Sequence, residues 1–151
     1  QFCVYNSAGS VHVVVDVHGF YADASVAGGL VFHPVTPKRV LDTRNGTGVV
    51  SRSGALTSAG LSVLASSPAA GEASQVKAVV GNLTGTQPSA PMYVTAWPSG
   101  QQRPFASSLN LVPGETAPNM VQLRTGSDGK LGLFNSAGRT HAILDISGWF
   151  G

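Results

Sequence analysis

The sequence predicts an all-β protein, an antiparallel β-sandwich of about seven to nine short strands, with a closed β-barrel as the alternative. Two observations carry this prediction. The 151 residues include 19 glycines and 9 prolines, and many serines and threonines lie between short valine-rich runs. Such turn residues divide the chain into strand-sized pieces and leave no room for a long helix. In residues 11–17 (VHVVVDV), apolar side chains recur at every second position, which is the period of a strand.

The middle of the chain is expected to supply most of the strands. Pro34 and Pro37 should precede a short strand at residues 39–43, which the turn at residues 45–48 (NGTG) ends. Residues 49–74 show no clear period. Beyond them, turns that contain Pro or Gly separate four further strand candidates, at residues 76–83, 92–97, 108–112 and 120–123.

Both ends of the chain are predicted to form β-hairpins, over residues 2–19 and residues 131–148. The two hairpins have nearly the same sequence, since residues 4–21 match residues 133–150 with a constant difference of 129 in residue number. Most other positions exchange one apolar or aromatic residue for another. The positions of the first copy that recur identically in the second are Asn6, Ser7, Ala8, Gly9, His12, Asp16 and Gly19.

This repetition predicts the domain organisation. A similarity confined to two places one domain length apart indicates a chain taken from a tandem array. Residues 1–21 would then be the closing hairpin of a preceding unit, residues 22–29 a linker, and residues 30–151 one complete β-repeat unit. The alternative is a single domain with two similar edge hairpins.

Composition and charge exclude several classes of function. Forty-two per cent of the residues are apolar, only 11 per cent are charged, and the formal net charge is +2. No basic run is longer than Lys38-Arg39, so we expect no nucleic-acid partner. No stretch approaches the roughly 20 apolar residues of a membrane span, so we expect no membrane insertion. Low charge with abundant Gly, Ser and Thr favours a secreted protein, extracellular or at the cell surface.

A set of motifs in a fixed order connects residues 32–150 with a known kind of module. The chain contains FHPVTPKRVLDTRNGTG, then GNLTGT, WPSG and SSLNL, and finally LFNSAGRTHAILDISGWF. This succession resembles a tandem β-repeat module of large secreted bacterial surface proteins, and residues 4–21 match the closing hairpin of another copy. The resemblance implies a non-catalytic, all-β, exported module.

Cys3 is the only cysteine of the chain. Some modules of this kind carry a cysteine pair, one in the W-P-C-G turn and one just before the closing hairpin. Ser99 and Gly132 stand at these places in the complete unit, whereas Cys3 stands at the later place in the first copy. The resemblance therefore implies that Cys3 bonds to a cysteine outside this chain or, if all units are alike, that it is a buried free thiol.

A histidine and an aspartate recur in both copies, as His12 with Asp16 and as His141 with Asp145. Positions i and i+4 of a strand lie about 13 Å apart, so neither pair can share a proton or a metal ion by itself. We therefore expect structural residues that hydrogen-bond to a turn or to a neighbouring strand. A duplicated acid–base or metal site is the alternative, and no metal or other cofactor is expected.

The stretch Asp42-Thr43-Arg44 is the other candidate for chemistry. Asp and Thr side chains readily cap a turn such as the one at Asn45, and Arg44 can form a bidentate pair with a carboxylate. We expect this structural role, and the alternative is a hydrolase that uses Asp42. No nucleophile elbow, phosphate-binding glycine loop or zinc-spaced Cys/His set is present, so no enzyme is expected.

Tyr93, Thr95 and Trp97 alternate with small aliphatic residues along one predicted strand. If the aliphatic residues face the core, the two rings stand outward about 13 Å apart, a spacing that suits a short run of sugar rings. The alternative is that both rings pack under a loop or in the core, where most large aromatic side chains lie.

Two functions follow from these expectations. The first is a structural and adhesive module of an extracellular stalk or fibre, with units joined end to end and neighbouring copies as partners. Contacts between units would involve Cys3, Val11, Val13 and Val15, either within one covalent array or between separate subunits that lend a strand to one another. The second is a carbohydrate-binding module that anchors a larger protein to cell wall or polysaccharide.

Overall fold

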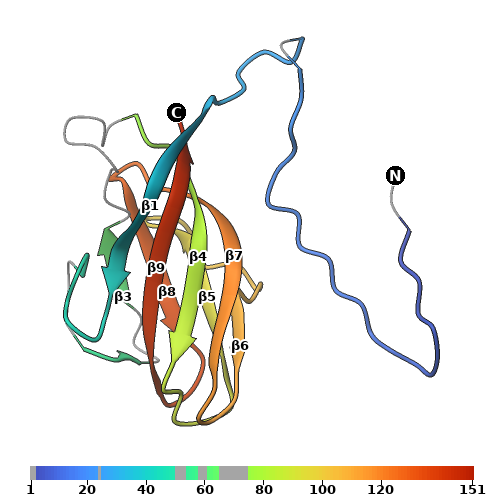
Figure 1. Ribbon diagram of the computed structural model, residues 1–151, viewed down its shortest axis with the longest axis vertical. Helices are drawn as coiled ribbons and strands as arrows, with labels where there is room; N and C mark the ends of the chain where they lie inside the picture. Colours follow the sequence, from blue (N-terminus) through green and yellow to red (C-terminus); the bar gives the residue numbers. More distant parts are fainter. Residues whose placement is uncertain (1–2, 24, 50–53, 58–60, 65–74) are drawn as a thin grey trace.

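The structure, a computed structural model, describes residues 3–23, 25–49, 54–57, 61–64 and 75–151. These residues form nine strands and no helix (Figure 1). The strands make two separate antiparallel sheets that face each other, which confirms the predicted sandwich and excludes the closed barrel. No helix in the described part of the chain is long and apolar enough to cross a membrane.

The larger sheet has five strands and the smaller sheet four. In the larger sheet the order is β1-β9-β4-β7, and the short β2 also pairs with β9. Its strands are β1 (Phe32–Asp42), β2 (Leu56–Thr57), β4 (Ala78–Thr86), β7 (Thr116–Arg124) and β9 (Arg139–Phe150). The smaller sheet has the order β3-β8-β5-β6, with β3 (Leu61–Leu64), β5 (Met92–Pro98), β6 (Leu109–Leu111) and β8 (Lys130–Asn135).

The hydrophobic core lies between the two sheets. Leu41, Leu83 and Leu144 extend into it from the larger sheet, and Val94 and Leu133 from the smaller one. Along β4, buried side chains alternate with partly exposed ones, as expected for a strand with one face on the core. At about 1.5–3 kcal/mol for each buried aliphatic side chain, this layer is the main favourable contribution to folding.

Strand β9 lies inside the larger sheet and pairs antiparallel with β1 on one side and β4 on the other. Phe32, the first residue of β1, pairs with Phe150, the last residue of β9. Just beyond them, Val31 and Gly151 exchange two backbone hydrogen bonds of 2.9 and 3.1 Å. The chain therefore enters and leaves the sandwich at one end, which we call the linker pole. The opposite end, where β9 begins at Arg139, we call the free pole.

Strand β1 is longer than the sequence predicted. Pro34 and Pro37 were expected to lie before it, but both lie within it. β1 forms the outer edge of the sheet, where a proline nitrogen needs no partner, and the pairing register shifts between Pro34 and Lys38. The edge position therefore accommodates prolines that would break an interior strand.

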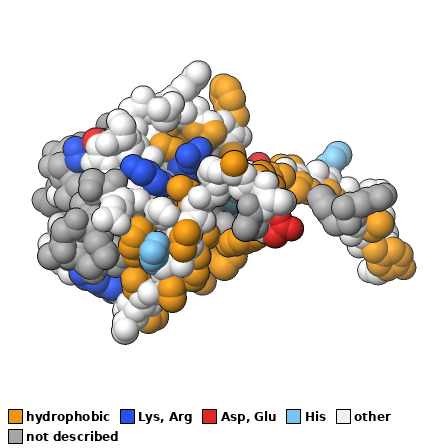
Figure 2. Space-filling view, turned by 90° about the horizontal axis from the view of Figure 1, so that it is seen from above, with side chains coloured by type: hydrophobic (Ala, Val, Ile, Leu, Met, Phe, Trp, Pro, Cys, Tyr) orange, Lys and Arg blue, Asp and Glu red, His pale blue; other side chains and the backbone are white. Residues whose placement is uncertain are grey.

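Neither predicted hairpin is found. At the C-terminus both strands form, as β8 and β9, but they lie in different sheets and pair with other strands, so the turn between them crosses from one layer to the other. The N-terminal prediction is wrong for the part that the structure describes, since residues 3–19 contain no strand and are exposed throughout. They project from the linker pole as an extended segment (Figure 1), and Figure 2 shows hydrophobic side chains along this projection. The alternation of residues 11–17 suits a strand, but a strand forms only where a partner satisfies its backbone groups.

Matched positions in the two copies provide a test of the core. We expect Leu144→Ala to lower the free energy of unfolding by about 2–5 kcal/mol, because it leaves a cavity between the sheets. Val15→Ala, at the corresponding exposed position, should change it by less than about 0.5 kcal/mol. Urea denaturation measures both values, and similar losses for the two variants would contradict this assignment of the core.

Candidate functional site

The apolar residues of the first copy are exposed, whereas their counterparts belong to the core. Val13 and Val15 are 55% and 54% exposed, while Ala142 and Leu144 at the matching positions are 0% and 1% exposed. The first copy thus presents to solvent the face that the second copy buries. Exposed apolar stretches of this kind mark surfaces that bind another protein surface.

The turn of the hairpin has the same geometry in both copies. The Asn6 side chain donates to the backbone oxygen of Gly9 at 2.9 Å, and Asn135 donates to Gly138 at 3.2 Å. Both glycines have positive φ, 66° and 53°, which glycine adopts without strain. In the second copy Asn135 also donates to the backbone oxygen of Leu56 at 3.3 Å and accepts a hydrogen bond from the backbone N–H of Ala137 at 3.3 Å. The bond from the asparagine side chain to the glycine is therefore common to both copies.

Gly19 and Gly148 show why a glycine recurs near the end of the hairpin. A Cβ atom at Gly148 would collide with the ring of Phe32, which lies on the backbone of β9. At Gly19 nothing lies within 4 Å of such an atom. Packing therefore requires a glycine at position 148. At position 19 packing requires one only if another chain segment covers it.

Among the described residues, the recurring aspartate has an ionic partner in the second copy only. Arg39 of β1 donates two hydrogen bonds to the Asp145 carboxylate, at 2.8 Å from Nε and 3.0 Å from Nη2. This bidentate pair bridges two neighbouring strands and raises the pKa of the Arg39 guanidinium. Within the described residues, Asp16 has no hydrogen-bond or ionic partner.

The recurring histidine likewise has a partner in the second copy. Nδ1 of His141 lies 3.1 Å from the hydroxyl of Thr43, and that hydroxyl also accepts a hydrogen bond of 3.0 Å from the backbone N–H of Ala142. His12 has no such contact in the described part of the chain. His141 and Thr43 thus tie the end of β1 to β9.

Asp42 is a buried carboxylate held by two arginines. Arg44 donates to it from Nε at 2.9 Å, from Nη2 at 2.7 Å and from its backbone N–H at 3.0 Å, and Arg39 adds a longer contact at 3.5 Å. The Arg44 hydrogen bonds hold the pKa of Asp42 at about 2, below its ordinary 3.8, although burial acts in the opposite direction. These contacts fix the chain as it leaves β1 and turns at the free pole.

This arrangement of Asp42, Thr43 and His141 is closed to a substrate. Thr43 and Asp42 are 0% and 2% exposed, and the Thr43 hydroxyl is already engaged on two sides. A nucleophile needs an open face where the reacting atom can sit. The described residues also contain no cluster of three or more His, Cys, Asp or Glu side chains that could hold a metal ion. What the geometry can do is fasten β1 to β9.

The three residues of the predicted sugar platform are not equally accessible. Tyr93 is 41% exposed, whereas Thr95 is 1% exposed and donates its hydroxyl hydrogen to the backbone oxygen of Ala106 at 2.8 Å. The Trp97 indole donates to the backbone oxygen of Gln101 at 3.0 Å. The loop that follows β5 therefore lies over the sheet between the two rings, and a continuous run of sugar rings has no open path there.

Cys3 is exposed in this chain. At the matching position of the complete unit, Gly132 lies under the indole of Trp97, and a Cβ atom there would stand 2.6 Å from the ring. A cysteine at this position needs a different placement of the indole. The complete unit is thus built around a glycine where the first copy carries Cys3.

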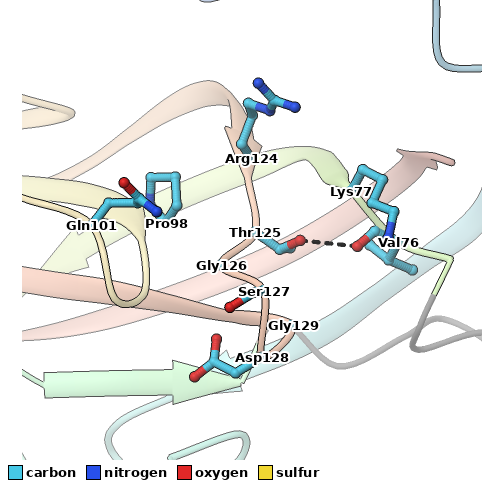
Figure 3. Close-up of a pocket in the computed structure, with 10 residues that line it drawn as sticks. All are labelled: Val76, Lys77, Pro98, Gln101, Arg124, Thr125, Gly126, Ser127, Asp128 and Gly129. Atoms are coloured by element: carbon cyan, nitrogen blue, oxygen red, sulfur yellow. Dashed lines mark hydrogen bonds between the residues drawn. The ribbon is translucent and has the colours of Figure 1, made fainter. Parts of the chain in front are cut away.

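A cavity of about 710 Å³ opens at the linker pole beside the turn between β7 and β8 (Figure 3). Its polar groups do not converge, since Figure 3 shows Arg124 pointing away from Asp128. The Asp128 carboxylate instead accepts hydrogen bonds from Ser99 and from the backbone of Lys130, both at 3.1 Å. These contacts stabilise the turn and leave the cavity without a set of groups aimed at one ligand.

Two groups of contacts were not found by sequence reasoning. The first is the ion pair between Arg39 and Asp145. The recurrence of the aspartate in both copies was the one signal that could have pointed to a cationic partner. The other is Gln122 on β7, whose backbone oxygen lies 3.3 Å from Nδ1 of His18 and whose side chain donates to the Tyr21 hydroxyl at 3.1 Å. No pattern in the sequence indicates this second contact.

The Asp42 contacts predict an acid-sensitive contribution to stability. Because the pKa of Asp42 is lower in the folded than in the unfolded protein, its contribution is complete above about pH 4 and is lost as the pH falls towards 2. We expect Asp42→Asn to cost about 1–2 kcal/mol at neutral pH, since both arginines are nearly half exposed and screening reduces the effect. Urea denaturation of both proteins from pH 7 to pH 2 should show this difference shrinking below pH 4, and a constant difference would contradict the assignment.

Two comparisons with known protein sequences identify no relative. No protein-family model matches the chain, and no curated protein matches it. A function must therefore be argued from the duplicated hairpin and the contacts described above.

Proposed function

We propose that the chain is part of a structural module of an exported bacterial surface stalk or fibre. Residues 30–151 are one complete unit of a tandem array, and residues 1–21 are the closing hairpin of the unit before it. One observation carries the proposal: nearly the same 18-residue sequence occurs twice, and its apolar side chains are buried in one place and exposed in the other. The low charge and the ordered motifs support export and a non-catalytic role.

Three kinds of residue in the first copy lack the partners that their counterparts have. Among the described residues, no sheet faces Val13 and Val15, no aromatic ring covers Gly19, and no arginine contacts Asp16. A strand without a neighbour leaves its backbone groups unpaired, so a sequence that keeps all three features benefits from them only when it is inserted in a sheet. A preceding unit with strands equivalent to β1, β4 and β5 supplies every one of these partners.

The strand order of the larger sheet helps to distinguish a covalent array from a fibre of separate subunits. In donor-strand fibres each subunit lacks a strand and accepts one from its neighbour. Here the position between β1 and β4 is already filled by β9 of the same chain. A second copy of this chain therefore offers residues 4–21 no vacant place, which favours the covalent array.

Exchanging the two copies tests the proposal directly. We expect a hybrid chain, in which the sequence of residues 4–21 replaces residues 133–150, to fold as a monomer with cooperative unfolding. Its stability should fall by a few kcal/mol, because Val13 in place of Ala142 and Phe20 in place of Trp149 require repacking. Circular dichroism and urea denaturation measure both properties.

Two variants of the hybrid provide matched controls. Their substitutions lie in the grafted segment and keep its original numbers, 4–21. Val15→Asp should abolish cooperative unfolding, since it places a charge at the buried Leu144 position. His18→Asp should be tolerated, because Ser147 at that position is exposed. A hybrid that fails to fold, or that tolerates both changes, would show that residues 4–21 are not a closing hairpin.

Removal of the first copy tests the domain boundary. We expect a chain that starts at Ala22 to match the full chain within about 0.5 kcal/mol, because residues 3–21 contribute no buried core residue. It should also sediment as a monomer. Loss of stability, or dissociation from an assembly that only the full chain forms, would place the first hairpin in this unit or in a joint between subunits.

A further inference from the structure

We propose that consecutive units lie side by side in the same orientation, with all linkers at one pole and with the surface around Gln122 on β7 in contact with the preceding unit. This inference rests on the proposed tandem array. It concerns how the units are arranged, and it replaces the end-to-end joining expected from the sequence.

The first step is the position of the linkers. In the complete unit, Phe32 and Phe150 pair at the linker pole, so the chain enters and leaves there. Tyr21 corresponds to Phe150, so the preceding unit also ends at its own linker pole. Residues 22–31 therefore join one linker pole to the next. End-to-end joining needs a chain that enters at one pole and leaves at the other, and this topology does not allow it.

The second step is the reach of the linker. Ten residues span at most about 35 Å when fully extended. The 12 residues of β9 rise about 40 Å, so the linker is shorter than one unit is tall. Two arrangements satisfy this limit. Either the linker poles of neighbouring units face each other, or the units stand beside each other with these poles level.

The third step is the course of residues 10–21, which distinguishes the two arrangements. They run upward towards the linker pole on the β7 side of the sandwich, in the same direction as β9, and come nearer to the sandwich as they rise (Figure 1). Contacts hold their last part there: His18 and Tyr21 reach Gln122, and the Tyr21 ring lies 6.1 Å from that of Phe150. These residues form the β9 equivalent of the preceding unit, so that unit stands beside β7 in the same orientation. If the linker poles faced each other, residues 10–21 would run in the direction opposite to β9.

The fourth step is the nature of the surface. β7 ends the order of the larger sheet, and within the described residues its outer edge pairs with no strand. Met120 on this strand is 68% exposed, and Gln122 offers both its backbone oxygen and its side-chain amide to the preceding segment. Open edge strands are usually covered or blocked in native proteins. A neighbouring unit at this position covers the edge of β7.

Pulsed EPR on a two-unit chain tests the arrangement. Residues 1–151 are followed directly by residues 23–151, so that Gly151 takes the place of Ala22 at the junction. Ser147→His and Phe150→Tyr in the first unit provide the contact residues that His18 and Tyr21 provide here. Cys3→Ser removes the native thiol, and Pro113→Cys in both units carries a spin label at each free pole.

We expect a distance of roughly 25–40 Å between the labels, against about 80 Å for units with facing linker poles. Met120→Glu with Gln122→Glu in the second unit should lengthen and broaden this distance, because two charges would be buried in the contact. Asn110→Glu, an exposed position on β6, should leave it unchanged.

Thermal unfolding of the same chain separates the two possible failures. If both units unfold with the midpoint of a single unit and the distance is near 80 Å, the side-by-side arrangement is wrong and the array stands. An equal distance in the Glu variants and the parent chain would also overturn the contact at β7. If the two-unit chain does not fold as two units, the tandem array fails and the inference fails with it.

Discussion

The pairing of β9 with both β1 and β4 is the constraint on which the rest of the structure depends. β9 connects the edge strand to the remainder of the larger sheet, and its inward side chains Leu144, Ile146 and Trp149 fill the core opposite the smaller sheet. β8, which precedes β9 in the chain, lies inside the smaller sheet. Residues 130–150 therefore supply an interior strand to each layer. Without this segment both sheets would be incomplete.

The polar contacts at the end of β1 reinforce its pairing with β9. Burying the Asp42 carboxylate costs free energy unless it is paired and hydrogen-bonded, and three donors of Arg44 meet that requirement. Arg39 extends the contacts to Asp145, and Thr43 extends them to His141. Each of these contacts joins the end of β1 to β9 or to its turn. Their main effect is to hold in register the second half of an edge strand whose first half contains two prolines.

Much of the fold follows from local sequence, and what does not follow depends on distant partners. The turn residues and the short apolar runs between them were enough to predict a sandwich. They failed at β1, because prolines are tolerated at an edge and edge position is a property of the whole sheet. The alternation of residues 11–17 failed for the opposite reason, since this segment has no strand partner among the described residues. The Arg39–Asp145 pair spans 106 residues of sequence, and only the register of β1 against β9 brings it together.

The two hydrogen bonds between Val31 and Gly151 also determine how the fold responds to force. Tension on the chain acts across β1 and β9 at their adjoining ends, perpendicular to the strands. Antiparallel strands loaded in this way peel apart one hydrogen-bonded pair at a time, because the bonds lie along the direction of the pull. In a sandwich pulled from opposite ends, all hydrogen bonds between the two strands would carry the load together, so the force needed to separate them would be higher. In the proposed array, each unit would therefore begin to open at low force from one end.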